Sequence, residues 1–421
     1  MAGKLDQLIA ELCSNGVEYK KLREVATISR GGSFQKKDYV ENGFPCIHYG
    51  QIYTLYELFV EETANFISDE VATKQKKAVT NDIIMAVTSE NIEDVCKCVA
   101  WLGNGEVAVS GHTAIIHHTL DPKYMVYYLH SSMFYSQKVK LAHGTKVIEV
   151  KPDSLGEIKL PVPPLEVQRE IVRVLDNFTF LTAELTAELK ARRKQYEYYR
   201  NKILSSNKQE NTKDISVGDV CNIITDYVAA GSFADIAKNV QYKSEPNYAQ
   251  LVRTVDIKSN FTKSDPVFVN EQAFHFLWRV NLDKECIILP NIGVNCGEVY
   301  FIKPEKLPYA NNVLGPNAIM VRSSTENNRF LSYIFQCPDF QSKLRKIISP
   351  GGQTKFNKTE FKKIKLQLPP LYIQNRVVNI LDKFDTVCND ISIGLPAEIA
   401  ARQKQYEYYR DKLLAFKELN A

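Results

Sequence analysis

The sequence predicts an α+β fold with two globular domains of mixed α/β structure, separated by two long helices that pack as an antiparallel coiled coil. Three observations lead to this prediction. The chain of 421 residues carries two near-identical segments half a chain apart. Both segments have a heptad pattern, which is typical of packed helices. The segments between them contain short apolar runs bounded by turn residues, which is typical of strands.

The near-identical segments identify a tandem repeat. Residues 191–204 (ARRKQYEYYRNKIL) and 401–414 (ARQKQYEYYRDKLL) agree at eleven of fourteen positions, at an offset of 210 residues. Upstream, 160–178 (LPVPPLEVQREIVRVLDNF) matches 366–384 (LQLPPLYIQNRVVNILDKF) at an offset of 206. Chance does not produce such collinear matches, so the chain is predicted to be a duplication with pseudo-twofold symmetry.

Weaker echoes continue into the diverged segments. IHYGQI (47–52) lies where VRTVDI (252–257) lies in the second copy. Likewise, GHTAI (111–115) matches GPNAI (315–319). The diverged segments are therefore predicted to be two versions of one domain.

Each near-identical segment is predicted to be a long helix. Both begin with Pro-Pro-Leu, and proline suits the first helical turn because its missing N–H costs nothing there. Apolar residues then recur at steps of three and four, the pattern of a coiled-coil seam. The first seam contains Ile171, Leu175, Phe178, Thr182, Leu185, Leu189, Arg192, Tyr196, Tyr199 and Ile203. The second contains Val377, Leu381, Phe384, Cys388, Ile391, Leu395, Ile399, Arg402, Tyr406, Tyr409 and Leu413.

The second helix contains four additional residues, because the offset between the copies changes from 206 to 210. Gly394 and Pro396 lie at this stutter, so the second helix is predicted to kink or break there. The first helix holds Thr-Ala-Glu-Leu twice in succession at 182–189. We expect this region to set the length of a spacer, through Thr182, Leu185, Thr186 and Leu189 in the first helix and Leu395 and Ile399 in the second.

The diverged segments read as α+β domains. Apolar runs at 82–88, 107–109, 114–116, 286–289 and 318–321 predict strands, and one helix is predicted near 124–142 with a counterpart near 329–348. The polar stretch SSNKQENTKD contains no apolar residue and predicts a linker. The predicted order is an N-terminal helical segment (1–20), a first domain (21–158), a first helix (159–204), the linker (205–214), a second domain (215–364) and a second helix (365–421).

Composition excludes several classes of protein. No run of about 18 apolar residues is present, and Asp6 and Glu11 lie where a signal peptide would be apolar, so neither a membrane span nor secretion is expected. Nine scattered cysteines suit reduced thiols and a cytoplasmic location. A net charge of +4 permits a polyanionic partner without requiring one.

Motifs of catalysis are not found in the sequence. It contains no phosphate-binding loop, no HExxH, no GxSxG and no glycine-rich dinucleotide fingerprint. Cys96 and Cys98, with His112, His117 and His118 downstream, are one candidate zinc set, but cysteines and histidines of a core are the preferred interpretation. We therefore expect no catalytic residue, no metal ion and no cofactor.

The repeated PPLEVQREIVRVLD segment and the helix ending in KQYEYYRNKIL resemble the specificity subunits of type I restriction–modification systems. The opening KLDQLIAELCSNGVEYKKLREVATISRGGSF is also similar to that family. The resemblance implies a DNA-binding subunit whose two target-recognition domains, at 21–158 and 215–364, each read one half of an interrupted double-stranded DNA target. It also implies conserved helices that dock two methyltransferase (modification) subunits and, through them, restriction/translocase subunits.

DNA contacts are expected from basic, amide and hydroxyl side chains in glycine-marked loops, because phosphates need cations and base edges need donors and acceptors. The first domain offers Arg30, Ser33, Gln35, Lys36, Lys37, Gln51, Tyr53, Thr88, Ser89, His143, Thr145 and Lys146. The second offers Lys238, Lys243, Arg253, Asn291, Asn295, Gln353, Thr354 and Lys355.

Docking of protein partners is expected on the helices. Tyr198 and Tyr408 fall off the heptad seam, and with Arg200 and Arg410 they are candidates for contact with a methyltransferase subunit. Two other functions stay open: a stand-alone DNA methyltransferase or nuclease, and a purely structural coiled-coil scaffold.

Overall fold

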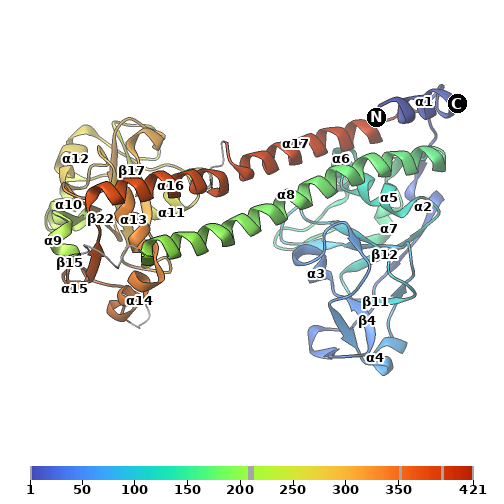
Figure 1. Ribbon diagram of the computed structural model, residues 1–421. Helices are drawn as coiled ribbons and strands as arrows, with labels where there is room; N and C mark the ends of the chain where they lie inside the picture. The colour runs from blue at the N-terminus through green and yellow to red at the C-terminus, as the bar shows by residue number, and fades with distance from the viewer. Residues whose placement is uncertain (1, 207–212, 350–352, 390–392, 420–421) are drawn as a thin grey trace. The chain divides into compact units, whose positions relative to one another are not determined.

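The computed structural model describes residues 2–206, 213–349, 353–389 and 393–419 (Figure 1). It divides into two compact units. Unit 1 comprises Met1–Ala187 with Ala397–Ala421, and unit 2 comprises Glu188–Pro396. Each unit thus contains one diverged segment together with parts of both near-identical segments.

Two five-stranded sheets form the body of unit 1. The first has the order β2 (Ala26–Arg30), β12 (Thr113–His118), β8 (Ile83–Ala86), β10 (Cys98–Trp101) and β5 (Phe59–Val60). The second has the order β3 (Tyr39–Val40), β6 (Asn65–Ile67), β4 (Phe44–Ile47), β11 (Val107–Val109) and β7 (Lys77–Ala78). Every residue of β8, β10 and β11 is buried, which explains why these strands are continuous apolar runs in the sequence.

Short elements complete unit 1. Two small ladders join β1 (Tyr19–Lys21) to β14 (Lys159–Pro161) and β9 (Thr88–Ser89) to β13 (Ile148–Glu149). The helices before the long one are α1 (Ala2–Leu12), α2 (Leu22–Val25), α3 (Tyr49–Thr54), α4 (Asp69–Thr73), α5 (Pro122–Leu129), α6 (Ser132–Leu141) and α7 (Pro152–Leu155), with a 3-10 turn at Lys36–Asp38. Buried tyrosines of α5 contribute to the main core of the unit.

Unit 2 repeats this plan with smaller sheets. One has the order β16 (Ile223–Asp226), β22 (Ala318–Arg322), β19 (Cys286–Pro290) and β20 (Tyr300–Ile302), and the other the order β18 (Phe268–Val269), β17 (Ala249–Val252) and β21 (Asn312–Leu314). A ladder joins β15 (Lys213–Ser216) to β23 (Lys365–Leu368). Its short helices are α9 (Val217–Val220), α10 (Phe233–Asn239), α11 (Thr254–Lys258), α12 (Glu271–Phe276), α13 (Asn328–Gln336), α14 (Pro338–Ile347) and α15 (Lys358–Lys363), with 3-10 turns at Tyr227–Ala230, Trp278–Val280 and Pro304–Lys306.

All five predicted strand runs are strands, but the helix predicted near 124–142 was wrong in one respect. It is two helices, α5 and α6, because Ser131 ends one helix and caps the next: its Oγ accepts a hydrogen bond from the N–H of Phe134 (3.3 Å). The counterpart near 329–348 is likewise divided into α13 and α14, and Pro338 occupies the first turn of α14.

The first long helix, α8 (Leu165–Ser206), is continuous through 42 residues, and it extends two residues into the predicted linker. The second is broken, as predicted, into α16 (Leu371–Asn389) and α17 (Leu395–Leu414). Gly394 precedes α17 and Pro396 lies in its first turn, where proline is tolerated. The predicted seam residue Ile391 lies outside the described residues.

The long helices pair in an antiparallel way inside each unit. In unit 1, α17 lies along the first part of α8, and the ring of Tyr409 stacks on Phe178 at 5.4 Å (Figure 1). In unit 2, Arg193 Nε donates to the carbonyl oxygen of Cys388 (3.4 Å), so the last part of α8 lies beside α16.

The predicted heptad seam is visible in the exposure of α8. Thr182, Leu185 and Leu189 are each half-buried, while the residues on either side of each are exposed. A four-residue repeat at 3.6 residues per turn keeps successive seam positions on nearly one face. The seam prediction is therefore confirmed through the Thr-Ala-Glu-Leu repeat.

Each unit completes its core with an aromatic ring from the helix of the other repeat. Tyr406 is 7% exposed in the main core of unit 1, and Tyr196 is 5% exposed in that of unit 2. The packing predicted for these two tyrosines is confirmed. The packing predicted for Tyr199 is wrong, because this side chain is 40% exposed.

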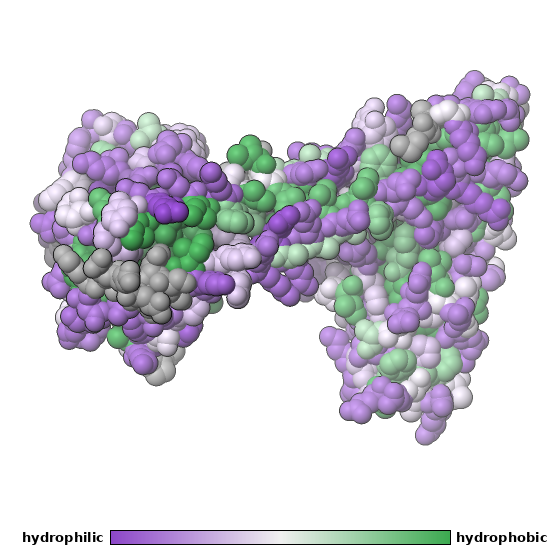
Figure 2. All heavy atoms as spheres, viewed as in Figure 1, coloured by the Kyte–Doolittle hydropathy of each residue, from purple (hydrophilic) through white to green (hydrophobic). Residues whose placement is uncertain are grey.

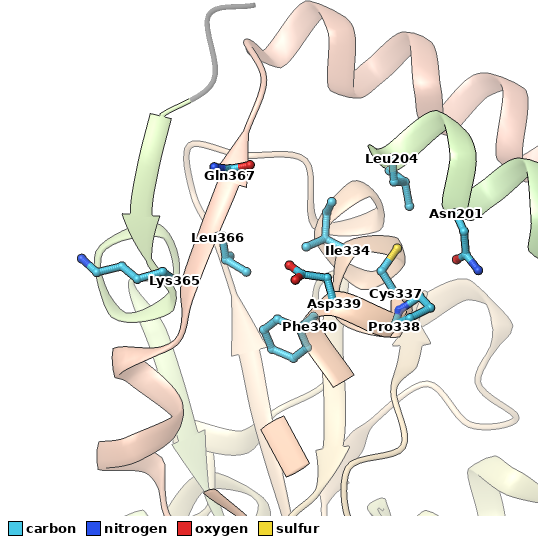
Figure 3. Close-up of a pocket in the computed structure, with 10 residues that line it drawn as sticks. All are labelled: Asn201, Leu204, Ile334, Cys337, Pro338, Asp339, Phe340, Lys365, Leu366 and Gln367. Carbon is cyan, nitrogen blue, oxygen red and sulfur yellow. The ribbon is translucent and has the colours of Figure 1, made fainter. Parts of the chain in front are cut away.

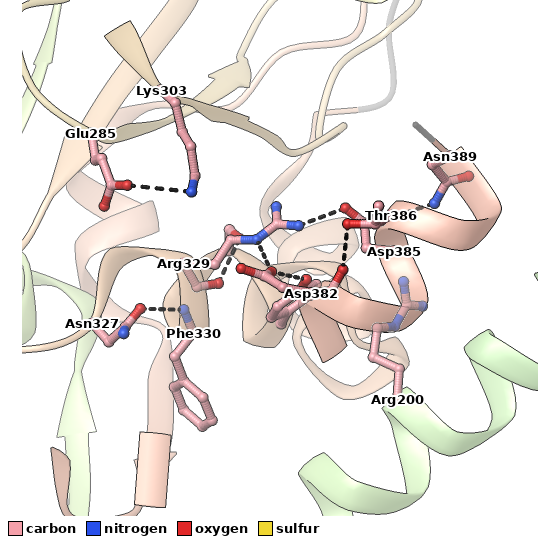
Figure 4. A network of polar contacts seen from close by, with 12 residues as sticks. Arg200, Glu285, Lys303, Asn327, Arg329, Phe330, Asp382, Asp385, Thr386 and Asn389 are labelled. Carbon is pink, nitrogen blue, oxygen red and sulfur yellow. Dashed lines mark hydrogen bonds and ion pairs between the residues drawn. The ribbon is translucent and has the colours of Figure 1, made fainter. Parts of the chain in front are cut away.

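A polar clasp holds the first turns of each long helix to its unit. In unit 2, Asp382 accepts hydrogen bonds from Arg329 Nε (2.7 Å) and the Tyr333 hydroxyl (2.6 Å), while Asp385 accepts from Arg329 Nη2 (2.6 Å) (Figure 4). Bonds between charged partners are stronger than neutral ones. Unit 1 has the matching arrangement, at 2.7 and 2.6 Å, in Lys123, Tyr127 and Asp176.

Much of the visible surface is hydrophilic, but hydrophobic side chains are exposed on the helices (Figure 2). Those most exposed on α8, α16 and α17 are Phe180, Leu181, Tyr198, Leu371, Tyr372, Val387 and Tyr408. Among the described helices, none has the length and apolar character required to cross a membrane.

Burial of the two core tyrosines leads to a stability prediction. Tyr196→Ala is expected to lower the free energy of unfolding by about 3 kcal/mol or more, because it leaves a cavity in the core of unit 2. Tyr198→Ala, two residues along the same helix, is the matched control and should change it by about 0.5 kcal/mol or less. Urea unfolding of the full chain, followed by circular dichroism, measures both. Equal effects would contradict the assigned burial.

Candidate nucleic-acid interface

Four strands of unit 1 end at one surface. β2 and β8 are both antiparallel to β12 and hence parallel to each other, and β4 is parallel to β11. Backbone hydrogen bonds join the residues that follow these strands: Gly32 N donates to Val109 O (2.7 Å), Ser110 N to Ile47 O (3.0 Å) and Val87 N to His112 O (2.9 Å). Side chains at the carboxyl ends of all four strands are thereby gathered on one side of the unit.

A groove of about 450 Å³ opens among these strand ends. The predicted Arg30, Ser33 and Gln35 line it, together with Gly32, Phe34, His48, Tyr49, Ser110, Gly111 and His112. Tyr49 connects two imidazoles, since its ring centroid is 4.5 Å from that of His48 and 5.3 Å from that of His112. The groove therefore combines a cation, amide and hydroxyl groups, and a cluster of rings.

Cationic side chains lie at the groove, and one of its histidines has a lowered pKa. Burial lowers the pKa of His48, and the nearby charges of Lys36 and His112 lower it further. The predicted Lys36 and Lys37 are both exposed at the rim. Arg30 also lines the groove but is paired with Glu149, so an anion bound here would compete with that carboxylate.

A hairpin stands beside the groove. His143 and Glu149 exchange both backbone hydrogen bonds (3.0 and 2.8 Å), which closes a loop whose tip carries the exposed Thr145 and Lys146. The hairpin pairs with Thr88–Ser89 through β13, and Arg30 Nη2 lies 3.4 Å from Glu149 Oε1. The structure thus brings together the predicted loop residues at 30–35 and 143–146 with Ser89. We call these residues, with His48, Tyr49, Ser110 and His112, the strand-end surface of unit 1.

Unit 2 builds the same arrangement from different residues. Gly315 N donates to Val252 O (2.8 Å), and Asn291 N donates to Asn317 O (3.0 Å). The backbones of Ser349 and Lys355 also pair, as those of His143 and Glu149 do in unit 1: Ser349 N donates to Lys355 O (2.9 Å). The strand-end surface of unit 2 comprises Asp226, Arg253, Thr254, Asn291, Asn295, Asn317, Gln353, Thr354 and Lys355.

Contacts inside this second surface fix its loops. Thr354 Oγ1 donates to Gly293 O (2.6 Å), and Gly293 N donates to Thr354 O (2.9 Å). The predicted Asn295 is tied to α11, because its Oδ1 accepts from Lys258 Nζ (2.7 Å). Gln353, Thr354 and Lys355 are exposed.

Arg253 is held in a fixed orientation. Its Nε and Nη2 donate to the two carboxylate oxygens of Asp256 (3.0 and 2.7 Å), and Nη2 also donates to the carbonyl oxygen of Asp265 (2.7 Å). Asp256 is 1% exposed, so the arginine is anchored from below. Nη1 is not among these donors.

Several predicted DNA contacts do not lie on the strand-end surfaces. Gln51 is buried, and its amide bonds Asn65 Oδ1 (2.7 Å) and the backbone N–H of His48 (2.8 Å). The Tyr53 hydroxyl donates to the carbonyl oxygen of the buried Thr88 (2.8 Å), which ties α3 to β9. These three side chains stabilise loops from inside, so their assignment as DNA contacts is withdrawn.

Lys238 and Lys243 are exposed but lie apart from the residues that form the surface of unit 2. Lys238 is in the last turn of α10, and the backbone of Lys243 pairs with Phe268. We do not include them in the candidate interface.

Seven residues of these surfaces were not predicted: His48, Tyr49, Ser110 and His112 in unit 1, and Asp226, Thr254 and Asn317 in unit 2. None of them lies in a run of basic residues. The weak echoes of the repeat contain part of the signal. IHYGQI and VRTVDI align His48 and Tyr49 with Arg253 and Thr254, whereas GHTAI and GPNAI align His112 with Pro316, so only the backbone bonds show that His112 corresponds to Asn317.

One further cavity is much smaller than the groove of unit 1. In unit 2, a pocket of about 140 Å³ lies between the last turns of α8, the α13–α14 junction and β23 (Figure 3). Figure 3 shows Leu204 on the α8 side and Phe340 and Leu366 on the other. This volume is well below the ~300 Å³ of small ligand pockets, so we regard it as a packing defect beside a docked helix. Among the described residues, no three His, Cys, Asp or Glu side chains are grouped to hold a metal ion.

The predicted docking residues fall into two classes. Tyr198 and Tyr408 are 60% and 61% exposed, in agreement with their place off the seam. Arg200 and Arg410 are turned inward: Arg200 Nη1 donates to Gln336 Oε1 (3.3 Å), and the Arg410 side chain is only 12% exposed beside Asp411. The prediction that these two arginines contact a methyltransferase subunit is therefore wrong, because their guanidinium groups bond to side chains of their own units.

The two strand-end surfaces together define a class of protein. Cations suit phosphates, whereas amides, imidazoles and a held guanidinium suit base edges, so these surfaces are typical of sequence-specific DNA recognition. Comparison with known proteins agrees. The family model of the type I restriction modification DNA specificity domain matches residues 14–193 and again residues 209–401.

Individual relatives are similar over most of the chain. A putative type I restriction enzyme specificity subunit of Haemophilus influenzae is 32% identical over 329 residues, covering 75% of this chain and 76% of that protein. A type I restriction enzyme specificity subunit of Escherichia coli is 33% identical over 270 residues, covering 61% of this chain and 63% of that protein. The chain therefore belongs to the family of type I restriction–modification specificity subunits, as its sequence resemblance implied.

A solved structure supports the fold. A chain from a study of complex assembly and conformational transition of the type I R-M system superposes with a TM-score of 0.60 at 15% identity. The superposition covers 95% of this chain and 97% of that chain.

Proposed function

We propose that this specificity subunit reads an interrupted double-stranded DNA target, with one half-site bound by each unit. The observation that carries the proposal is the duplication of the strand-end surface with altered side chains. A duplicated reader is expected where the target has two parts, because each domain then contacts its own half-site.

The charge of the two surfaces supports recognition of two different sequences. The pair at the end of β2 in unit 1 is Arg30 with Glu149, whereas the end of β16 in unit 2 carries Asp226, paired with Lys358 at 2.8 Å. The strand end thus carries the cation of an ion pair in unit 1 and the anion of an ion pair in unit 2. Strand ends that carry different groups are suited to different base patterns.

The chain itself is proposed to be non-catalytic and to need no cofactor. It would supply specificity to methyltransferase subunits, and through them to restriction/translocase subunits. Any methylation of DNA by the purified chain with a methyl donor, in the absence of these partners, would overturn this part of the proposal.

The test of independent reading is a domain chimera. Replacing residues 21–158 with the matching segment of a relative is expected to change only one half-site. The cut points suit this exchange, because Lys21 and Lys159 are partners at the end of the β1–β14 ladder, which stays on the helical scaffold. Methylome sequencing measures the result. A change in both half-sites would contradict independent units.

Docking of partners is proposed on the exposed faces of the helices, around Tyr198 and Tyr408. Because the same sequence, QYEYY, is presented once by α8 and once by α17, we expect two methyltransferase subunits per chain. Native mass spectrometry of the assembled methyltransferase measures this ratio. A strict one-to-one complex would count against duplicated docking.

The length of α8 is proposed to set the distance between half-sites. The boundary between the units falls within the Thr-Ala-Glu-Leu repeat, at Ala187 and Glu188, where the helix is continuous. A third Thr-Ala-Glu-Leu inserted after Leu189 adds about 6 Å and a net turn of about 40°. One base pair adds about 3.4 Å and about 35° of twist.

We therefore expect this insertion to lengthen the non-specific spacer of the target by one base pair, or two, with both half-sites unchanged. Deletion of one unit should shorten it correspondingly. An insertion of only two residues is the control, since it rotates the seam by about 200° and should prevent assembly. Methylome sequencing decides: an unchanged spacer, or altered half-site bases, would show that α8 does not measure the distance.

A further inference from the structure

The two units share a backbone framework where a short helix follows a parallel strand. α3 follows β4, and α11 follows β17. In unit 1 the backbone N–H of His48 donates to Gln51 Oε1 (2.8 Å), and in unit 2 that of Arg253 donates to Asp256 Oδ2 (2.8 Å). Both acceptor side chains are buried, so the residue at the start of each helix is fixed from inside the domain.

A second shared feature lies just before the next strand of each sheet. His112 precedes β12 with φ of 63°, and Asn317 precedes β22 with φ of 68°. The carbonyl oxygens of these two residues accept the matching hydrogen bonds from Val87 N and Asn291 N. Left-handed backbone is uncommon outside glycine, and its presence at the same place in both units marks a retained loop geometry.

The side chains on this framework differ between the units. The residue at the helix start is His48 or Arg253, and the residue after it is Tyr49 or Thr254. His112 and Asn317 are both exposed. Phosphates look alike in every sequence, whereas base pairs differ in their donors and acceptors. A fixed backbone that carries different side chains in two copies is therefore what base reading requires.

We propose that these positions read the bases of the two half-sites: His48, Tyr49 and His112 in unit 1, and Arg253, Thr254 and Asn317 in unit 2. The inference rests on the proposed function and specifies which residues perform it. The buried Gln51 and Asp256 act as positioning residues, because they hold the first reading residue by its backbone and do not contact DNA.

The chemistry of each position suits a base edge. An Asn amide matches the N6 and N7 groups of adenine, so Asn317 is expected to read an A·T pair. Arg253 is oriented by Asp256 and retains Nη1, which suits an acceptor of guanine. In unit 1, the rings of His48, Tyr49 and His112 form one cluster and offer both donors and acceptors to the same base step.

A reciprocal exchange tests the proposal. His112→Asn places the unit 2 side chain on the unit 1 loop, and Asn317→His does the reverse. Both residue types tolerate left-handed backbone better than most others, so neither exchange imposes new strain. Asn81→His is the matched control: Asn81 is exposed with φ of 77°, but it precedes β8 and so lies at the opposite end of that strand from the strand-end surface.

The measurement is methylome sequencing with the full chain assembled with its methyltransferase subunits. His112→Asn is expected to change base preference at one position of the first half-site by at least about fivefold, and Asn317→His at one position of the second. In each case the other half-site and the spacer stay unchanged. Asn81→His should leave the whole motif as it is in the unaltered chain.

The outcomes separate the inference from the proposed function. If the unaltered complex methylates no interrupted motif, the proposed function fails. If it does, but the exchanges leave base preference unchanged or reduce methylation equally at all sequences, these side chains contact phosphate at most and the inference is overturned. Should an exchanged chain fail to assemble, Tyr49→Thr and Thr254→Tyr test the same framework at its neighbouring position, and no change in preference there overturns it.

Discussion

Each unit depends on a core that is closed by a helix from the other repeat. Tyr406 occupies the core of the unit that contains the first diverged segment, and Tyr196 occupies that of the second. Full burial of a large apolar side chain contributes about 1.5 to 3 kcal/mol, and burial of a tyrosine ring is of the same order. Each QYEYY segment must fit a similar site, which explains why the two segments have the same sequence.

This constraint explains why the two copies of the repeat are similar in the long helices and different in the domains. The clasp at Asp176 and its counterpart at Asp382 joins a long helix to the adjacent domain, so the aspartate and the tyrosine are kept in both copies, while the cation is Lys123 in one and Arg329 in the other. The strand ends lie apart from that contact. Their backbone is held by buried acceptors such as Gln51 and Asp256, which leaves exposed side chains free to differ without loss of the fold.

The parts of the fold that sequence predicted are those with a local periodic signal. The seam of α8 was predictable because heptad spacing decides which face of a helix is buried, and the strand at 107–109 was predictable because both its faces are buried. The break before α17 followed from Gly394 and Pro396. Which helix completes which core was not predictable, because identical repeats give no preference for either partner.

The candidate site was predicted only in part, for a related reason. Basic loops such as Thr145-Lys146 are evident in composition, and they are exposed. Gln51 was misassigned because the inward or outward direction of a polar side chain in a six-residue helix depends on its tertiary partners, here Asn65. The inward turn of Arg200 toward Gln336 has the same origin. The role of His112 was not predicted, because no neighbouring residue in the sequence indicates its left-handed backbone conformation.

The discontinuity of unit 1 has a consequence for the order in which the chain can fold during synthesis. Unit 2 is a continuous stretch, Glu188–Pro396, so every residue of its core is synthesised before residues 397–421. Unit 1 must wait, because Tyr406 and Leu414 belong to its core and the backbone of Val17 pairs with Glu418 near the end of the chain. Domains usually fold in the order of their synthesis. Here the first domain to emerge is the last to close, because its apolar docking site for α17 stays open to solvent until α17 has left the ribosome.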